Sequence, residues 1–478
     1  MNSSQEGGKA KVLGKMKKLL VLIVAMISFG ALAAVPKYVF LFIGDGMAVP
    51  QRMTADEFSR ARGDGPLAMN ALPFSATTRT CSADSLVTDS AAAATAIACG
   101  SKTKNHSVGV DERGDSVFSS AKAAKDAGLK VGIASTVTIT HATPAGFYAH
   151  SKSRGDMEGI ARDLADSGFD FFAGGGLDVR EEKSKAYDYA VEKGYRIVRT
   201  KQDFLSLGPG DGKILTRFTN GPLETAIDVN EDVSANQPTL AEIVAKGIEM
   251  LDNDKGFFLM AEGGRIDWAG HANDAATNLR DVLALDEAVK VALAFLEKRP
   301  DETLVVVTGD HETGGMSMGF AGTGYALYMD RLANQTMSVG RFESKAAKLF
   351  SSLKDEATFD AFKPLMTEAF GFAFEGDAKE NPMVLSKDEL KQLSEAFVHD
   401  LAFHESKIEE NKAYDGEKRY LLGGACRLVM SHKCGIGWSS GAHTAMPVLT
   451  TAKGVGAEKF SGFIENTDIS KIMKSFYR

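Results

Sequence analysis

The sequence predicts an α/β protein with one large, mostly parallel central sheet, helices on both faces of that sheet, and a helical insertion. Two observations lead to this prediction. Between residues 37 and 316, short apolar runs alternate with stretches of helical periodicity, the pattern of a parallel sheet whose strands are joined by helices. The apolar runs are also hydrophobic on both faces, as expected of strands that are covered from both sides.

The expected elements follow one another along the first two thirds of the chain. Strands are predicted where largely apolar residues stand together, at residues 38–43, 130–135, 169–173, 256–261 and 303–308. Helices are predicted at residues 116–127, 156–167, 239–251 and 274–298. The composition, 44% hydrophobic and 25% charged, is that of an ordinary globular protein, so the chain has ample material for a buried core.

A different pattern occupies residues 317–437, which lack apolar strands and contain polar helices instead. One helix is expected to begin at Ser386, because Glu389 follows three positions later as in a capping box. Sheet-like sequence returns at residues 445–449. We therefore expect a core formed by residues 35–316 and 438–478, and an insertion at 317–437 that forms a helical cap over or beside the functional site.

The first 34 residues have the features of a cleaved secretory signal. Five lysines precede an almost wholly apolar run of 15 residues, 19–33, and small residues follow at Ala33 and Ala34. This order is typical of a signal peptide, and a bilayer span needs roughly 20 apolar residues. We expect a secreted or periplasmic protein with cleavage near Ala33-Ala34 and no stable membrane anchor; Met16 would be an equally ordinary start.

The remainder of the chain is acidic. The formal net charge of the whole chain is −8, and removal of the basic first 34 residues leaves −12. This charge gives no general electrostatic footprint for nucleic acid, so no nucleic-acid-binding surface is expected. Cations gathered at one place would have to bind any anionic substrate.

Groups that can bind metal follow four of the predicted strands. Ligands gather at the carboxyl ends of the strands in a parallel α/β sheet, so these side chains are expected to meet at one edge. Imidazole together with carboxylate suits zinc, and sets of oxygen ligands suit magnesium. The sequence thus predicts a multinuclear hydrolase site with these candidate ligands: Asp45, Thr143, Glu262, Asp267, His271, Asp310 and His311.

Ser90, at the start of an alanine-rich stretch, is the candidate nucleophile. A serine in this position could simply cap a helix. However, the small alanine side chains permit close approach, and a helix N-terminus favours an anion. Ser90 does not stand in a Gly-x-Ser-x-Gly elbow, which would indicate activation by a histidine triad. A metal ion is therefore the expected activator of its hydroxyl group.

The segment Asp89-Ser90-Ala91-Ala92-Ala93-Ala94-Thr95 resembles the signature of the alkaline phosphatase family. The resemblance covers nearly all of residues 37–316 and resumes at Gly441-Ala442-His443-Thr444. It implies that Ser90 is transiently phosphorylated and that two zinc ions and one magnesium ion assist. By motif, the ligands of the family's first zinc ion correspond to Asp267, His271 and His443. The ligands of its second zinc ion correspond to Asp45, Asp310 and His311. The ligands of its magnesium ion correspond to Asp45, Thr143 and Glu262.

The resemblance also assigns residues around the phosphate. Arg154 matches the family's phosphate-clamping arginine, and Asp89 matches the acid that helps to hold it. His141 and Trp268 stand where some members carry Asp and Lys. This pair resembles fast, cold-adapted marine members, and because imidazole is also a zinc ligand, it leaves the metal at the third site open.

The activity implied by the resemblance is hydrolysis of phosphate monoesters to an alcohol and inorganic phosphate at alkaline pH. Inorganic phosphate would be both product and inhibitor, and the protein would be a homodimer. Three alternatives remain. A sulfatase needs a C-x-P-x-R motif around its nucleophile, which this chain lacks. A phosphodiesterase of the same fold is harder to exclude. A non-enzymatic phosphate binder would need neither Ser90 nor the histidines at strand ends.

The four cysteines give one further expectation. Cys426 and Cys434 are close in the sequence and lie just upstream of His443, and a secreted chain can form disulfides. We therefore predict a Cys426–Cys434 bridge. Cys81 and Cys99, which flank the segment of Ser90, could be paired or free, and we expect them to be free and buried.

Overall fold

The computed structural model describes residues 35–180, 182–405 and 421–477. The predicted signal segment, residues 1–34, lies outside the described residues, as do residues 406–420 of the predicted insertion. Within the described ranges, no helix combines the length and the apolar character that a membrane crossing requires.

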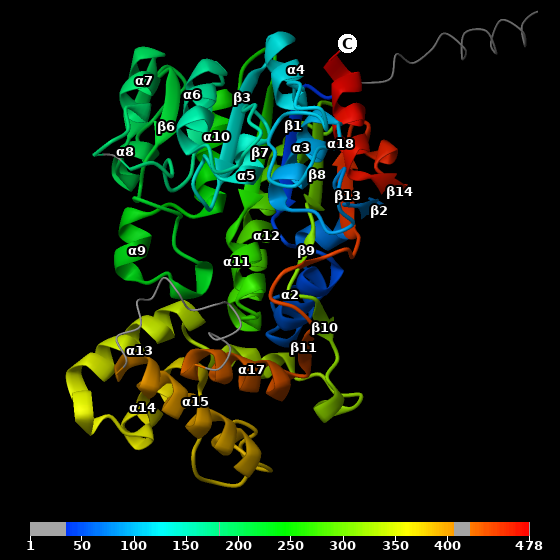
Figure 1. Cartoon of the computed structure of the whole chain (residues 1–478). Helices are drawn as coiled ribbons and strands as arrows, with labels where there is room; N and C mark the ends of the chain where they lie inside the picture. Colours follow the sequence, from blue (N-terminus) through cyan, green and yellow to red (C-terminus); the bar gives the residue numbers. More distant parts are fainter. Residues whose placement is uncertain (1–34, 181, 406–420, 478) are drawn as a thin grey trace, which may run out of the picture.

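A ten-stranded sheet forms the centre of the molecule (Figure 1). Its pairings are parallel except for the two that β13 makes with its neighbours β2 and β8. The predicted fold class is thereby confirmed. From one edge to the other, the strands are β14 (Gly462–Glu465), β2 (Phe74–Arg79), β13 (Val448–Gly454), β8 (Thr303–Gly309), β1 (Tyr38–Gly44), β7 (Phe257–Gly263), β3 (Lys130–Ser135), β4 (Phe171–Ala173), β6 (Lys213–Thr216) and β5 (Tyr195–Val198).

The middle strands β8, β1 and β7 are buried along their whole length. Side chains of a strand point alternately to the two faces of a sheet. Accordingly, Phe40 and Phe42 of β1 join one hydrophobic cluster, while Val39, Leu41 and Ile43 join the other. Burial on both faces explains why these strands read as continuous apolar runs.

Helices cover both faces of the sheet. The first cluster includes residues of α2 (Val49–Ala61), α10 (Leu240–Leu251) and α12 (Ala275–Lys298). The second includes residues of α3 (Ser90–Cys99), α4 (Ser120–Asp126), α6 (Met157–Asp166) and α18 (Asn466–Lys474). The helix predicted at 116–127 begins later because Ser119 is its cap and accepts a hydrogen bond from the Lys122 amide.

In the described parts of residues 339–434, four helices gather below the sheet in Figure 1: α13 (Val339–Leu353), α14 (Phe359–Phe370), α15 (Lys387–Glu405) and α17 (Leu422–Cys434). The chain enters this region through β10 (Met316–Met318), which pairs antiparallel with β11 (Ile436–Trp438) on the way out. The capping box at Ser386 is present, with each of Ser386 and Glu389 accepting from the other's amide at 2.8 and 3.2 Å. The division into core and insertion stays a prediction.

The predicted disulfide is wrong, since all four cysteines are free. Cys426 and Cys434 lie on the same helix, α17. Eight positions along an α-helix separate two Cα atoms by about 12 Å, whereas a disulfide spans at most about 7 Å. Cys99 is free and buried as expected, and Cys81 is free but partly exposed.

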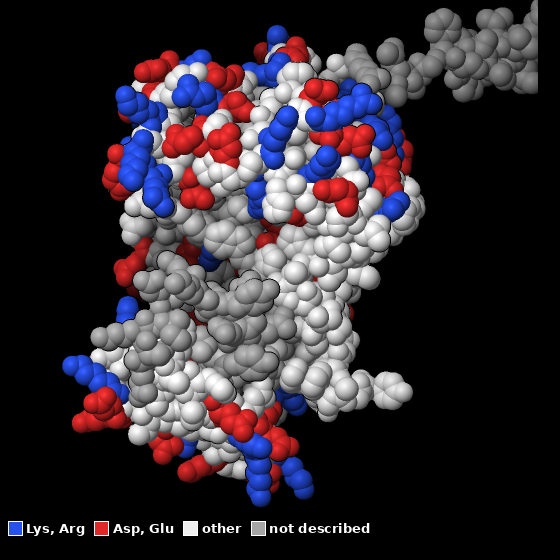
Figure 2. Space-filling model, viewed as in Figure 1, with Lys and Arg blue, Asp and Glu red and all other residues white. Residues whose placement is uncertain are grey.

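Charged side chains of both signs are interspersed on the face shown in Figure 2. Lys and Arg lie among Asp and Glu over both the upper part, which holds the sheet, and the lower part, which holds α13 to α15. On the right of Figure 2, the described surface between these parts shows few charged groups.

Candidate active site and metal centre

The carboxyl ends of the three middle strands lie level with one another. Gly44, at the end of β1, is in register with Gly263 of β7 and with Gly309 of β8. Asp45 and Asp310 come directly after β1 and β8, and Glu262 stands one residue before the end of β7. The shared register therefore brings three carboxylates together, as the sequence predicts.

These three carboxylates are buried, and Asp45 has ligand atoms within 4.8 Å of one in Asp310 and of one in Glu262. Burial raises the pKa of Asp45 well above its usual range, and the neighbouring Asp310 raises it further. Burial likewise raises the pKa of Asp310, and it raises that of Glu262 to about 7. Negative charge held together in this way favours cations bound among the carboxylates.

Among the residues that the structure describes, three groups of side chains have ligand atoms that lie within 4.8 Å of one another. Each group combines carboxylate with imidazole, and two groups share Asp45. The groups are, in order, Asp267, His271 and His443; Asp45, Asp310 and His311; and Asp45, His141 and Glu262. The first and second of these groups contain the residues predicted as ligands of the two zinc ions.

The third group differs from the predicted magnesium set by including an imidazole. Thr143 is buried there too, with its hydroxyl oxygen 3.4 Å from Oδ2 of Asp45. Burial and the nearby Arg154 lower the pKa of His141 to about 4. Its ring is therefore neutral at physiological pH, the form in which a histidine binds metal.

Several buried polar atoms at this edge have no hydrogen-bond partner among the described residues. They include Oδ1 of Asp45, Oε1 of Glu262, Oδ2 of Asp310 and Nδ1 of His141. Buried polar atoms are normally paired, and atoms of this kind are the ones that metal ions take as ligands. The residues present thus fit bound cations.

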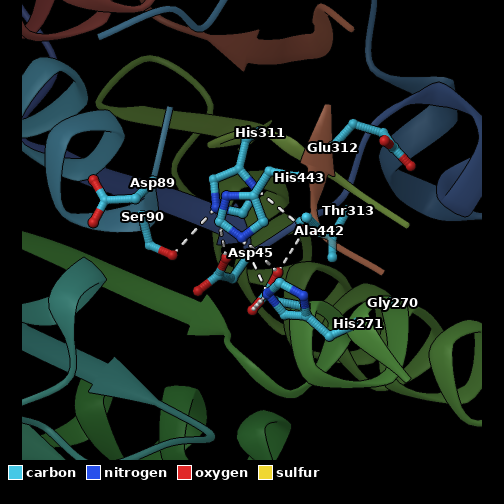
Figure 3. Close-up of polar contacts among 12 residues, drawn as sticks. Asp45, Asp89, Ser90, Gly270, His271, His311, Glu312, Thr313, Ala442 and His443 are labelled. Carbon is cyan, nitrogen blue, oxygen red and sulfur yellow. Dashed lines mark hydrogen bonds and ion pairs between the residues drawn. The ribbon is translucent and has the colours of Figure 1, made fainter. Parts of the chain in front are cut away.

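A two-stranded ribbon brings His443 to this cluster from the far end of the chain. β9 (Glu312–Thr313) pairs antiparallel with β12 (His443–Thr444), and His443 is in register with Thr313. As a result, the ring of His443 stacks on that of His311, with 3.7 Å between their centroids. Nε2 of His443 lies 3.1 Å from Nε2 of His271 (Figure 3).

The same ribbon holds the ligands in place through two residues that the sequence analysis missed. The Thr313 hydroxyl donates to Oδ1 of Asp267 at 2.5 Å and lies 3.2 Å from Nδ1 of His311. Glu312 accepts from the Gln51 amide group at 2.6 Å and from the Thr444 hydroxyl. Their place directly after Asp310-His311 was the one available signal.

Ser90 is the first residue of α3, and Asp89, not Ser90, is the N-cap. Oδ1 of Asp89 accepts from the Ala92 amide at 3.0 Å. The Ser90 hydroxyl is therefore not used as a cap, and it lies 3.2 Å from Nε2 of His311 (Figure 3). Every residue of α3 is buried, so the small alanines allow the helix N-terminus to approach the metal-binding groups closely.

Arg154 lies beside the nucleophile. Its Nη1 donates to Oδ2 of Asp89 at 3.1 Å, and its Nη2 lies 3.3 Å from Nε2 of His141. Its backbone amide donates to the carbonyl of His106 at 2.7 Å, and His106 itself has a positive φ of 70°. The guanidinium is thus fixed between the cap of α3 and the third group.

Trp268 and a second serine complete the surroundings. The Trp268 ring stands edge-on to that of His141, with 6.2 Å between centroids. A Gly-x-Ser-x-Gly pattern does occur at residues 437–441, but its Ser439 is not on a strand-to-helix turn. Ser439 follows β11 and donates to the carbonyl of Gly315 at 3.3 Å. That pattern therefore does not provide a nucleophile elbow.

Replacing Thr313 with valine should lower metal affinity about 10- to 100-fold, as is typical when a group that orients ligands is lost. The valine keeps the shape of the side chain but cannot donate to Asp267. Metal titration followed by calorimetry measures the change. Thr313→Ser keeps the hydroxyl and should stay close to the parent protein, so equal losses in the two variants would contradict this role.

Comparison with known proteins agrees with this geometry. The family model described as alkaline phosphatase matches residues 36–171 and 173–478. Alkaline phosphatase 3 of Bacillus subtilis is 33% identical over 451 residues, which cover 91% of this chain and 87% of the relative.

Solved structures give the same result. A cold-active alkaline phosphatase from a psychrophilic Shewanella superposes with a TM-score of 0.76 at 27% identity, covering 92% of this chain and 100% of that one. A mutant alkaline phosphatase from the Antarctic bacterium TAB5, in which a histidine is replaced by aspartate and Mg is bound in the M3 site, gives a TM-score of 0.63 at 25% identity, covering 93% and 99%. The chain belongs to the alkaline phosphatase family.

Proposed function

We propose that this phosphomonoesterase hydrolyses phosphate monoesters in two steps, through a phosphoserine formed on Ser90. The observation that carries the proposal is the position of the Ser90 hydroxyl, 3.2 Å from His311 of the second group and at the N-terminus of a buried helix. Backbone amides at a helix N-terminus favour a bound phosphate. Arg154, held by Asp89 at 3.1 Å, adds a guanidinium on the same side.

The chain's own residues would bind and orient the substrate. Arg154 would hold two non-bridging oxygens of the phosphate, a geometry that suits a guanidinium. Ser90 would attack phosphorus, and water would later release inorganic phosphate from the phosphoserine. When bound, two zinc ions and one magnesium ion would lower the pKa of the Ser90 hydroxyl and neutralise charge on the transferred phosphate.

The charges of the site support an anionic substrate in an acidic protein. Three divalent ions and Arg154 outweigh the carboxylates that surround them, namely Asp45, Glu262, Asp267 and Asp310. Positive charge in excess, in a buried setting, would attract a phosphate dianion. Inorganic phosphate would bind for the same reason, as product and inhibitor.

The third group mixes two kinds of ligand, because His141 stands among oxygen ligands. We propose magnesium there, with Thr143 and Glu262 as ligands. In the TAB5 mutant with Mg in its M3 site, a histidine has been replaced by aspartate, whereas His141 is present in this chain; the proposal of magnesium therefore rests on the oxygen ligands Thr143, Asp45 and Glu262. We also propose export after signal cleavage and a homodimeric state.

A colorimetric assay on the metal-loaded protein tests the function. An aryl phosphate monoester, an aryl phosphate diester and an aryl sulfate should be supplied in parallel, each with and without chelator. Rapid, chelator-sensitive release from the monoester is the expected result. Faster release from the diester or from the sulfate would instead indicate a phosphodiesterase or a sulfatase. No release from any of the three substrates would favour a non-enzymatic phosphate-binding protein.

In the same assay, Arg154→Ala should lower kcat/KM for the monoester by about 10- to 100-fold, because charged hydrogen bonds contribute about 1.5–3 kcal/mol. A diester has only two non-bridging oxygens, so one oxygen on the arginine side would carry an alkyl group. Its hydrolysis should therefore fall much less. Arg154→Lys keeps the charge without the fork and should lie between. Equal losses of kcat/KM on the monoester and the diester would show that Arg154 does not discriminate between them, and would favour the phosphodiesterase alternative.

A further inference from the structure

A cavity of about 980 Å³ adjoins the candidate metal centre on the side of His271. One wall is formed by α11 (Arg265–His271), through Arg265, Trp268 and His271. The lining also includes Ser338 and Gly340, at the start of α13. Small-molecule sites commonly have volumes of about 300–1,000 Å³, so this space is large enough for a substrate's leaving group.

The histidines of the site lead step by step from Ser90 to this cavity. The Ser90 hydroxyl lies 3.2 Å from His311, the ring of His311 stacks on His443, and Nε2 of His443 lies 3.1 Å from His271 (Figure 3). In phosphoryl transfer the attacking and leaving oxygens stand roughly in line on opposite sides of phosphorus. A group that leaves opposite Ser90 would therefore pass His271 and enter the cavity.

Flat, stackable groups line the wall nearest to the metal centre. Trp268 is 39% exposed, and the guanidinium of Arg265 lies 4.8 Å from the centroid of its indole ring. Arg265 Nε is buried without a hydrogen-bond partner among the described residues. Nucleic-acid bases stack on aromatic rings and on guanidinium planes, so this wall suits a planar heterocycle.

Apart from the metal centre, the described residues that line the cavity carry no excess of either charge. Its described lining contains two arginines, Arg265 and Arg427, and two carboxylates, Asp274 and Glu343. These formal charges balance. A strongly anionic leaving group such as a nucleoside diphosphate would need an excess of cations, whereas a nucleoside would not.

We propose that this cavity holds the leaving group of the substrate and that the preferred substrates are nucleoside monophosphates. The inference rests on the proposed function. The Ser90 hydroxyl loses its proton to water and forms an O–P bond while the ester P–O bond breaks. The departing ribose oxygen takes a proton from water, which gives the neutral nucleoside. A second water then cleaves the phosphoserine to inorganic phosphate and restores Ser90.

Gly340 offers a direct test. A Cβ atom built on this residue would meet no atom closer than Oγ of Ser338 at 3.9 Å, so a larger side chain fits without displacing its neighbours. Gly340→Leu should fill part of the cavity without weakening α13, since leucine is a better helix former than glycine. Gly210→Leu is the matched control, because a Cβ there meets nothing within 4 Å and Gly210 does not line the cavity.

Two measurements on the metal-loaded protein decide the matter. Gly340→Leu should lower kcat/KM for adenosine monophosphate about 10- to 100-fold and leave methyl phosphate within about twofold of the parent. Adenosine alone should quench tryptophan fluorescence in the parent, since Trp268 is one of only two tryptophans, and much less in Gly340→Leu. Gly210→Leu should match the parent in both measurements.

The outcomes separate the inference from the function on which it rests. Equal effects of Gly340→Leu on both substrates, or unchanged nucleotide hydrolysis and adenosine quenching, would overturn the leaving-group site alone. A parent protein that hydrolyses neither substrate would overturn the proposed function and the inference with it.

Discussion

Replacing Ser90 with alanine should lower kcat/KM for an aryl phosphate by roughly 10⁴- to 10⁶-fold, the range seen when a covalent nucleophile is removed. The variant keeps the binding residues but has no oxygen to accept the phosphoryl group. Steady-state assays measure the loss. Acid quenching of the parent enzyme during turnover, followed by peptide mass spectrometry, should detect phosphate on the peptide that contains Ser90.

The structure indicates that Ser90→Ala should remove the hydroxyl group without destabilising α3. Asp89, not Ser90, caps α3, and the following four residues are already alanine, so the midpoint of thermal unfolding should stay close to that of the parent. Ser439→Ala is the matched control, since Ser439 is the serine of the chain's Gly-x-Ser-x-Gly pattern at residues 437–441. Loss of the phosphopeptide in Ser439→Ala but not in Ser90→Ala would reject the assignment.

Removing bound metal should abolish hydrolysis and also lower the midpoint of thermal unfolding, and zinc with magnesium should restore both. Without cations, burial raises the pKa values of Asp45 and Asp310, and neighbouring carboxylates, Glu262 among them, raise both further. A ligand that binds only the folded state adds about 4 kcal/mol at a thousandfold excess over its Kd. Calorimetry with and without chelator measures the shift.

Asp310→Asn sharpens this test because its two effects have opposite signs. The Oδ1 atom, which accepts from the Gly46 and His311 amides, can be kept by asparagine, while Oδ2, which lies 3.3 Å from Nε2 of His311, becomes an amide nitrogen. The metal-free variant should therefore unfold at the same temperature as the metal-free parent or above it, because one repelling charge is gone. Metal should raise its midpoint less. An increment as large as that of the parent would show that Asp310 is not a ligand.

The sequence predicted the middle of the sheet well and its margins poorly. β1, β3 and β8 were predicted within one residue because burial on both faces makes them continuous apolar runs. β2 alternates buried and exposed residues, and β14 is buried at no position. Strands of these kinds have no apolar run to detect, so only their hydrogen bonding to neighbours identifies them.

The candidate site shows the same division. Acids directly after buried strands were predictable, since the ends of parallel strands share one edge. The role of Thr313 was not, because a hydroxyl group that orients Asp267 has no distinctive spacing in the sequence. The disulfide prediction failed for a related reason. Proximity of Cys426 and Cys434 in the sequence was considered without the rise of the helix that carries both.

The position of β13 in the sheet sets the order in which the protein can be completed as it is synthesised. β13 lies between β2 and β8, so the early strand β2 has no neighbour linking it to the rest of the sheet until residue 454 has been made. His443 joins the metal-binding cluster at the same late stage, when the ribbon of β9 and β12 closes a loop between Glu312 and Thr444, which are 132 positions apart. Closing such a loop costs about 4 kcal/mol in chain entropy. A nascent chain that ends before β12 would carry Asp45, Asp310 and His311 but not the complete first group, so full metal loading would mark a finished chain.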